Sequence, residues 1–421
     1  MKIIIAGDGK VGMTLTRQLS AEGHDLTLID NDLSALESSE ERYDIMVVHG
    51  NCASMPVLRQ AGILEADLLI AATGADEINL LCCMSAHQMN KKLHTIARIR
   101  NPEYTSQIYE IRDAFALSLT VNPERQAAEE IEKLLKYPGF LRRDTFANGR
   151  VEIVELRINP DSKLCNRPLS QMNDIVNCQV LVCTVLRNGA AVAPDGNFVL
   201  QAGDRIFVTA ARADLTVLLK NLGIITRRAK QVILCGGGRI SFYLAKLLEK
   251  DGISVKLIEK EHDRCLDLAD QLEDAAVVCG DCSDQSLLES EHLDDCDALV
   301  TLTGLDELNI IVSLYGNSRG VPQIITKLGR MDNTRIVDDL PLGSVIKPKE
   351  LCCNIIVRYV RAMQNQTGAA VSVHAMADGQ AEAVEAVLEA IDWQGFTGEI
   401  SEINVGTLDD LYLVTVDGLI I

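Results

Sequence analysis

The chain carries the same set of turns twice, about 230 residues apart. The turn Gly-Asp-Gly at residues 7–9 recurs as Gly-Gly-Gly at residues 236–238, and the stretch Thr-Gly-Ala-Asp-Glu-Ile-Asn at residues 73–79 recurs as Thr-Gly-Leu-Asp-Glu-Leu-Asn at residues 303–309. Similar turns on two otherwise different stretches indicate a tandem duplication. We therefore expect two similarly folded domains, and we infer from the shared turns that both halves once bound a similar ligand.

Short apolar segments alternate with helical segments through the first copy. Such alternation predicts a parallel sheet with right-handed crossovers, the doubly wound sheet of Rossmann type, whose ligands lie beyond the carboxyl ends of the strands. The predicted strands are residues 2–6, 25–30, 45–49, 68–72 and 95–99, and the predicted helices are residues 12–22, 33–42, 55–61 and 77–90.

The first turn has the spacing of a phosphate-binding loop. Gly7, Gly9 and Gly12 follow an isoleucine-rich strand in G-x-G-x-x-G order, which lets backbone N–H groups approach a pyrophosphate at a helix N-terminus. Asp30 ends the next apolar run, about 20 residues on, where a carboxylate can bind ribose hydroxyls. The alternative is a glycine-rich turn in an α/β fold that binds no nucleotide.

A small mixed α/β lobe is expected after each Rossmann-like domain. The first lobe follows a helix at residues 124–136 and has predicted strands at 151–158, 180–187, 190–192, 197–200 and 205–210, then a helix at 215–222. Asn188-Gly189 between apolar strands predicts a hairpin. The second lobe is predicted as a truncated copy, with strands at 369–373, 410–416 and 419–421 and a helix at 381–390. The predicted domains are residues 1–136, 137–225, 226–367 and 368–421.

Composition narrows the class of partner. The formal charge of −20 opposes binding to nucleic acid or to anionic lipid, since both are polyanions. No apolar run approaches the roughly 18 residues that span a bilayer, so we expect a cytoplasmic protein. Most of the 13 cysteines lie in apolar contexts and are interpreted as reduced core thiols. The C-x-x-C at residues 279–282 leaves a redox pair as the alternative.

Together these motifs resemble the TrkA family, the regulatory subunits of Trk and Ktr potassium-uptake systems, which are built from two RCK (or KTN) domains. The resemblance covers nearly the whole chain. It implies a homo-oligomer, a dimer or tetramer, held at the inner face of the cell membrane by a membrane-embedded Trk/Ktr-type potassium channel subunit that it gates. It also implies NAD(H) or ATP/ADP as ligands.

The resemblance also implies which residues line each nucleotide cleft. The first cleft comprises Gly7, Asp8, Gly9, Lys10, Val11, Gly12, Asp30, Asn51, Cys52, Thr73, Gly74, Asp76, Glu77, Asn79 and Arg98. The second cleft comprises Gly236, Gly237, Gly238, Arg239, Ile240, Ser241, Glu259, Asp281, Cys282, Thr303, Asp306, Glu307, Asn309 and Lys327.

The two clefts differ in ways that predict different ligand preferences. Lys327 stands where the first copy has Arg98, and a lysine lacks the planar fork that binds a phosphate through two hydrogen bonds. Ser241 replaces the third glycine, and Asn51 departs from the usual aspartate. The acids Asp30 and Glu259 disfavour a 2′-phosphate, so we expect NAD(H) or an adenine nucleotide and not NADP.

Two further ligands follow from the resemblance. Glu124 matches a family position for a divalent cation, against the alternative that it stabilises a helix N-terminus. The equivalent of the small lobe at residues 151–210 can bind cyclic di-AMP, which makes a second-messenger receptor the third functional hypothesis.

The main alternative function is an NAD-dependent oxidoreductase. Such an enzyme needs a substrate domain that presents an acid or base to the nicotinamide. The seven histidines form no cluster with Lys or Asp outside the predicted turns, and the small lobe is too short to supply a substrate cleft. We therefore predict a regulator without catalytic residues.

Overall fold

The computed structural model describes residues 1–136, 142–146, 151–210, 212–222, 229–329, 340–364, 370–376, 381–386, 411–416 and 419–420. The chain divides into two compact units. One unit joins Met1–Ala127 to Lys347–Val360, and the other joins Ala128–Ile346 to Arg361–Ile421. Within the described ranges, no helix has the length and apolar character needed to cross a membrane.

The first unit is built on a parallel sheet, as predicted, which has one strand more than the five expected from the sequence. Its strands in spatial order are β3 (Met46–His49), β2 (Asp25–Asp30), β1 (Lys2–Ala6), β4 (Leu68–Ala71), β5 (His94–Arg98) and β6 (Leu119–Val121). Its helices are α1 (Lys10–Ala21), α2 (Leu33–Glu40), α3 (Met55–Gln60), α4 (Asp76–Met89), α5 (Pro102–Ile111) and the start of α6 (Pro123–Lys136). The order reverses between β1 and β4, and at such a switch point a crevice opens beyond the strand ends.

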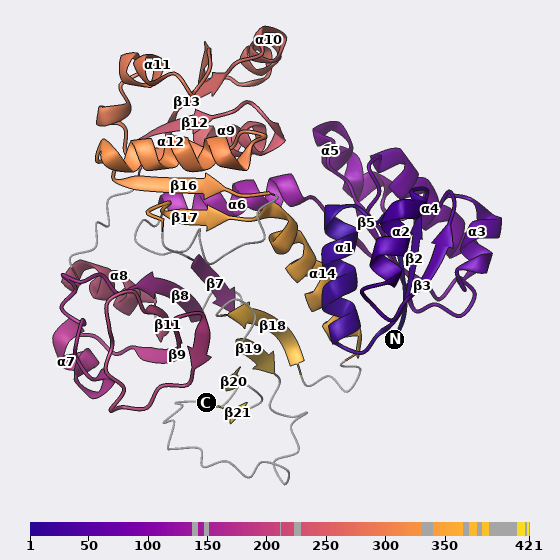
Figure 1. The fold of residues 1–421 in the computed structure, drawn as a ribbon, viewed down its shortest axis with the longest axis horizontal. Helices are drawn as coiled ribbons and strands as arrows, with labels where there is room; N and C mark the ends of the chain where they lie inside the picture. The colour runs from indigo at the N-terminus through magenta and orange to yellow at the C-terminus, as the bar shows by residue number, and fades with distance from the viewer. Residues whose placement is uncertain are drawn as a thin grey trace. The chain divides into compact units, whose positions relative to one another are not determined.

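A helix from far along the chain completes this unit. α14 (Pro348–Gln364) follows the second Rossmann-like domain in sequence, yet most of it belongs to the first unit and lies beside α1 (Figure 1). Cys353 Sγ donates to the Val11 carbonyl at 3.7 Å, and Tyr359 Oη lies 2.9 Å from His94 Nδ1. α14 therefore packs next to the first turn of α1.

The second unit repeats the strand order of the first. Its parallel sheet runs β14 (Ala276–Cys279), β13 (Ser254–Glu259), β12 (Gln231–Cys235), β15 (Ala298–Thr301), β16 (Gln323–Lys327) and β17 (Ser344–Ile346). Its helical segments are α9 (Arg239–Lys250), α10 (His262–Gln271), α11 (Gln285–Ser290), η3 (Leu293–Asp295) and α12 (Asp306–Ser318). The end of α6 belongs here: Lys136 Nζ lies 2.7 Å from Asp251 Oδ2, and Gln323 Nε2 donates to the Leu134 carbonyl at 2.9 Å.

The first small lobe is an antiparallel sheet packed on short helices. The strands lie in the order β10 (Ala190–Val192), β9 (Leu181–Arg187), β11 (Arg205–Ala210), β8 (Val151–Arg157) and β7 (Arg142–Phe146), and the helical segments are η2 (Leu169–Gln171), α7 (Met172–Val176) and α8 (Arg212–Asn221). Asn188 and Gly189 both have positive φ, 54° and 77°, as the predicted hairpin requires. The strand predicted at 197–200 is wrong, because only a single bridge joins Pro168 to Val199.

The last described segments form a second antiparallel sheet. Its order is β18 (Ala370–Met376), β19 (Ala381–Ala386), β20 (Leu411–Val416) and β21 (Leu419–Ile420). The helix predicted over 381–390 is wrong over Ala381–Ala386, since β19 pairs with strands on both sides, and residues 387–390 lie outside the described residues. The predicted domain boundaries at 137, 225–226 and 367–368 lie outside the described residues.

Candidate nucleotide sites

The turn after β1 has the geometry of a phosphate loop. Gly7 has a φ of +106°, and a Cβ there would meet the Thr73 backbone nitrogen at 2.9 Å, so only glycine lets the β1 and β4 turns approach each other. A Cβ at Gly12 would lie 1.8 Å from the Gly7 carbonyl oxygen. α1 has Gly9 as its N-cap, with no side-chain hydrogen bond. Its first N–H groups are therefore available to an anion.

The second turn repeats this geometry with one substitution. Gly236 has a φ of +103°, and α9 begins after Gly238 without a side-chain cap. Ser241, at the position of the third glycine, is buried, and its hydroxyl donates to the Gly236 carbonyl. The serine thus gains a hydrogen bond across the turn and leaves the helix N-terminus open.

The acid at the end of the second strand is fixed by main-chain amides in both copies. Asp30 Oδ2 accepts from the Asp8 amide at 2.6 Å, and Glu259 Oε2 accepts from the Gly237 amide at 2.6 Å. The second oxygen of each acid accepts from the amide two residues on, at 2.9 Å. Each carboxylate oxygen has two acceptor positions, so the acids can hold the glycine loop and still accept from ribose hydroxyls.

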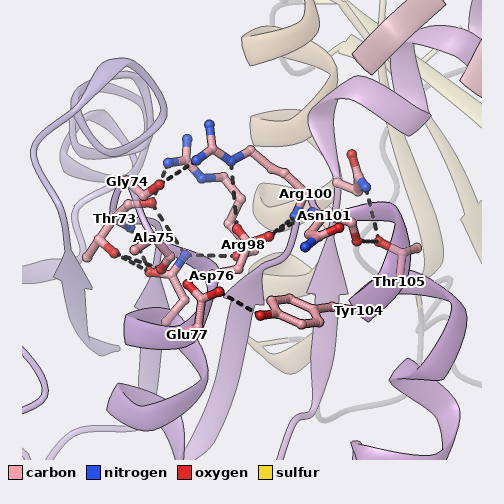
Figure 2. A network of polar contacts seen from close by, with 12 residues as sticks. Thr73, Gly74, Ala75, Asp76, Glu77, Arg98, Arg100, Asn101, Tyr104 and Thr105 are labelled. Carbon is pink, nitrogen blue, oxygen red and sulfur yellow. Dashed lines mark hydrogen bonds and ion pairs between the residues drawn. The ribbon is translucent and has the colours of Figure 1, made fainter. Parts of the chain in front are cut away.

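Two predicted ligand residues use their side chains to build the site. Asn79 is fully buried, and its Oδ1 accepts from the Thr73 amide at 2.8 Å and the Thr73 hydroxyl at 2.7 Å. Its Nδ2 donates to the Arg98 carbonyl at 2.8 Å. Asp76 accepts from the Arg100 and Asn101 amides at 2.7 Å each (Figure 2). These side chains join the β4 turn to the end of β5.

The second copy keeps both connections. Asn309 Oδ1 accepts from the Thr303 amide at 2.9 Å, and its Nδ2 donates to the Lys327 carbonyl at 3.0 Å. Asp306 accepts from the Gly329 amide at 2.9 Å. The neighbouring Glu77 and Glu307 are exposed at the first turns of α4 and α12, and Glu77 accepts from Tyr104 at 2.7 Å.

Cationic side chains at the ends of β5 and β16 distinguish the two copies. Arg98 donates to the Thr73 carbonyl and Arg100 to the Gly74 carbonyl, so two guanidinium groups lie together over the β4 turn (Figure 2). In the second copy Lys327 Nζ donates to the Thr303 carbonyl at 2.5 Å, and Gly329 stands in place of Arg100. Burial, with Arg100 next in importance, lowers the pKa of Arg98.

Arg100 lies in the candidate site, at the Gly74 carbonyl, and was not among the residues predicted from the sequence. The signal was present in the sequence, because Arg100 follows Arg98 by two positions at the end of one strand. The first site thus has a denser positive charge beside its β4 turn than the second. A polyphosphate is better matched by two guanidinium groups than by one ammonium.

The glycine loops also differ, because the first site has a carboxyl group, Asp8, that the second site lacks. Asp8 is buried and accepts from the Ser39 hydroxyl at 2.7 Å, whereas the second copy has Gly237 and Leu268 at these positions. A Cβ at Gly237 would lie 2.7 Å from Leu268 Cδ1 and 2.9 Å from Glu259 Oε2, so an aspartate there would require these two side chains to move. Burial, opposed by the Ser39 hydrogen bond and reinforced by Asp30, raises the pKa of Asp8.

The residues after the third strand divide between surface and core. Asn51 and Asp281 are exposed, and each accepts from the amide two residues on, at 2.9 Å and 2.8 Å. Cys52 and Cys282 are buried in the hydrophobic cores of their domains. Their side chains pack in these cores, whereas the side chains of Asn51 and Asp281 lie at the surface.

The remaining predicted residues lie at the helix starts. Lys10 and Arg239 are exposed at the first positions of α1 and α9, while Val11 and Ile240 are buried beneath them. Glu124 is half-buried near the start of α6, within electrostatic reach of Arg98. The described residues contain no group of three or more His, Cys, Asp or Glu side chains suited to a metal, so metal binding by Glu124 stays a prediction without companion ligands.

Comparison with known proteins identifies the two copies and the lobe between them. Residues 3–117 and 232–348 match the TrkA-N domain, and residues 153–223 match the TrkA-C domain. The chain is 33% identical over 392 residues to the Trk system potassium uptake protein TrkA of Haemophilus influenzae, covering 92% of this chain and 84% of the relative. It is 33% identical over 368 residues to a TrkA homolog of Archaeoglobus fulgidus, covering 87% and 83%.

Solved structures share the fold at low identity. The GsuK RCK domain superposes with a TM-score of 0.65 at 18% identity, covering 89% of this chain and 79% of that one. The GsuK channel bound to NAD gives a TM-score of 0.64 at 17% identity, covering 89% and 66%. The human SLO3 gating ring gives 0.52 at 11% identity, covering 86% and 83%. These likenesses show that the fold is that of RCK proteins.

Proposed function

The chain belongs to the TrkA family of Trk system potassium uptake proteins, and on that premise we propose that it is a nucleotide-sensing regulatory subunit that gates a membrane potassium channel or transporter. The observation that carries the proposal is the pair of phosphate-type turns, each with an uncapped helix start and a carboxylate held by the turn's own amide. Their recurrence, without a separate substrate domain among the described residues, supports sensing over catalysis.

The proposed ligands are NAD(H) or the adenine nucleotides ATP and ADP. Backbone amides at the starts of α1 and α9 would bind phosphate, and Asp30 and Glu259 would bind ribose hydroxyls. The double arginine of the first site favours more phosphate charge than the single lysine of the second. The structures of GsuK bound to NAD and GsuK bound to ADP are consistent with either class of ligand.

Two helices offer a route from the first site to the rest of the chain. α6 starts with Glu124 near Arg98 and ends in the second compact unit, while α14 packs its Cys353 on Val11 at the start of α1. A nucleotide that draws in Arg98 or the first turn of α1 would change the packing of both helices. Gating then follows if the two arrangements bind the nucleotide with different affinity.

The proposed setting is a homo-oligomer, a dimer or tetramer, in the cytoplasm. It would be attached to the inner face of the cell membrane through a membrane-embedded Trk/Ktr-type potassium channel subunit. The net charge of −20 argues against direct binding to anionic lipid, so the partner protein must supply the docking surface.

The test is potassium flux through the channel subunit of the same uptake system, reconstituted in liposomes with the purified protein. We expect NAD(H), ATP or ADP to change the flux, and Asp30→Ala and Glu259→Ala to weaken or remove the responses of their own halves. Asp161→Ala, an exposed acid of the small lobe, is the matched control. Flux that ignores every nucleotide would refute the proposal, and turnover of NADH with a small carbonyl would favour the oxidoreductase.

A further inference from the structure

Two thiols flank the ribose acid of the second nucleotide site. Cys265 lies in the first turn of α10, where its buried Sγ donates to the Glu259 carbonyl at 3.1 Å. Cys279 ends β14, is exposed, and is the register partner of Glu259 in the parallel sheet. Adjacent strands lie about 4.8 Å apart, so both cysteines are immediate neighbours of one glutamate.

The surroundings give the two sulfurs different chemical characters. His262 Nδ1 lies 3.8 Å from Cys279 Sγ, within reach of the thiol proton. Burial, and then the hydrogen bond with the Cys279 thiol, raises the pKa of Cys265 to about 11. The exposed sulfur therefore has a base and access to solvent, while the buried sulfur stays protonated beside it.

The neighbour of Cys279 is Cys265 and not Cys282, the partner that the C-x-x-C spacing suggests. Cys282 is buried in the hydrophobic core and makes its thiol contact with Cys235. The first half has His49 at the position of Cys279 and Leu36 at that of Cys265. The thiol pair therefore belongs to the second site alone, and the first site is an internal control.

We propose that Cys265 and Cys279 form a reversible disulfide that reports a peroxide oxidant to the second nucleotide site. His262 takes the proton of Cys279, and the thiolate attacks hydrogen peroxide, breaking the O–O bond to give a sulfenic acid. The released hydroxide recovers the proton from His262 as water. Cys265 sulfur then attacks the Cys279 sulfur, and the S–OH group leaves with the Cys265 proton as a second water. Two thiols are oxidised and one peroxide is reduced to two waters.

The disulfide acts on the site through the first turn of α10. Cys265 gives up its hydrogen bond to the Glu259 carbonyl, and its neighbour Arg264 donates from Nε to the Gly237 carbonyl at 2.9 Å. Movement of this turn disturbs both the ribose acid and the glycine loop. Loss of one such hydrogen bond corresponds to about threefold to tenfold weaker nucleotide binding. This effect on binding rests on the proposed nucleotide site, whereas disulfide formation does not.

The thiol chemistry is tested by mapping. The full-length chain is reduced, treated with one equivalent of hydrogen peroxide, alkylated and analysed by mass spectrometry. We expect a cross-link between the peptides of Cys265 and Cys279, reversed by dithiothreitol and absent from Cys279→Ser. Cys178→Ser, a half-buried thiol of the small lobe, should leave the cross-link unchanged. A sulfenic acid on Cys279 without the cross-link, or a cross-link to another cysteine, would overturn the proposal.

The effect on binding is measured by titrating ADP into Asp30→Ala protein, in which the second site reports alone. Oxidation should weaken ADP binding about threefold to tenfold, and Cys279→Ser in the same background should bind ADP equally before and after peroxide. An oxidised, cross-linked protein with unchanged affinity would contradict the coupling. Absence of ADP binding by the reduced protein would instead count against the nucleotide site itself, and the mapping would still decide the thiol chemistry.

Discussion

Replacing Asn79 by alanine should loosen the first nucleotide site from within. The amide holds the Thr73 N–H and the Arg98 carbonyl at 2.8 Å each, and the substitution leaves both without this partner. A buried backbone group left unsatisfied costs about 1–3 kcal/mol, so two cost about 2–6 kcal/mol. Thr73 is half-buried and water can reach part of the turn, which lowers the expected loss to about 2–4 kcal/mol.

The effect of Asn79→Ala is measured by amide hydrogen exchange and by nucleotide titration. In the Glu259→Ala background, where only the first site reports, Asn79→Ala should speed exchange at the Thr73 amide and weaken ADP binding about tenfold, or about 1.4 kcal/mol. Asn90→Ala is the matched control: its Nδ2 donates to the carbonyls of Ile63 and Ala66 at 3.0 Å each, at the other end of α4. It should lower stability and leave binding unchanged.

Two outcomes would contradict the role assigned to Asn79. If Asn79→Ala lost ADP binding with normal exchange at Thr73, the side chain would contact the nucleotide directly. If it lost stability as Asn90→Ala does and bound ADP normally, the connection between β4 and β5 would not set the site. Asn309→Ala should reproduce the expected result in the second half, because its hydrogen bonds are the same.

Two further predictions concern charges outside this connection. The pKa of Asp8 is raised above its ordinary value of 3.8, so the folded protein holds the Asp8 proton more firmly than the unfolded chain does. The free energy of unfolding therefore falls as the pH rises from about 4 through the raised pKa. The total fall is about 1.4 kcal/mol for each pH unit that separates the folded and unfolded pKa values. Asp8→Asn should remove this fall, converging with wild type below pH 4 and exceeding it at pH 7 in urea unfolding; parallel curves at all pH values would contradict the assignment. In the small lobe, Arg187 donates two hydrogen bonds to the buried Asp204, at 2.8 Å and 2.6 Å. In urea unfolding, Arg187→Ala should destabilise the lobe by about 2–4 kcal/mol, and Arg187→Lys should destabilise it by less. Equal losses in the two variants would argue against the bidentate pair.

Much of the architecture could be predicted from the sequence because it rests on local patterns. Buried isoleucines, glycines at fixed spacing and an Asn-Gly turn act within a few residues, and the parallel sheets and the hairpin at Asn188 formed as expected. The failure at residues 381–390 has the opposite cause. The segment is rich in Ala and Glu, which favour helix, but pairing with β18 and β20 outweighs that preference in Ala381–Ala386.

The candidate sites were predictable as turns but not as networks. The motif indicates that Asn79 and Asp76 belong to the site, whereas their roles depend on backbone groups of β5 and the residues just after it, about 20 positions away. The packing of α14 in the first unit joins residues more than 250 positions apart, which no local pattern encodes. The contact of Asp8 with Ser39, and that of Gly237 with Leu268, likewise could not be predicted from the loop alone. In each copy the second residue lies on the helix after the second strand, about 30 positions from the loop.

Equilibrium dialysis with radiolabelled ADP counts the nucleotide sites of one chain directly and shows whether two chemically different sites are present. Wild-type protein should bind two ADP per chain with separable affinities, and Asp30→Ala and Glu259→Ala should each bind one, with the affinity of the site left intact. Binding of a single nucleotide by the wild-type protein, or two unchanged sites in both variants, would contradict the presence of two different nucleotide sites.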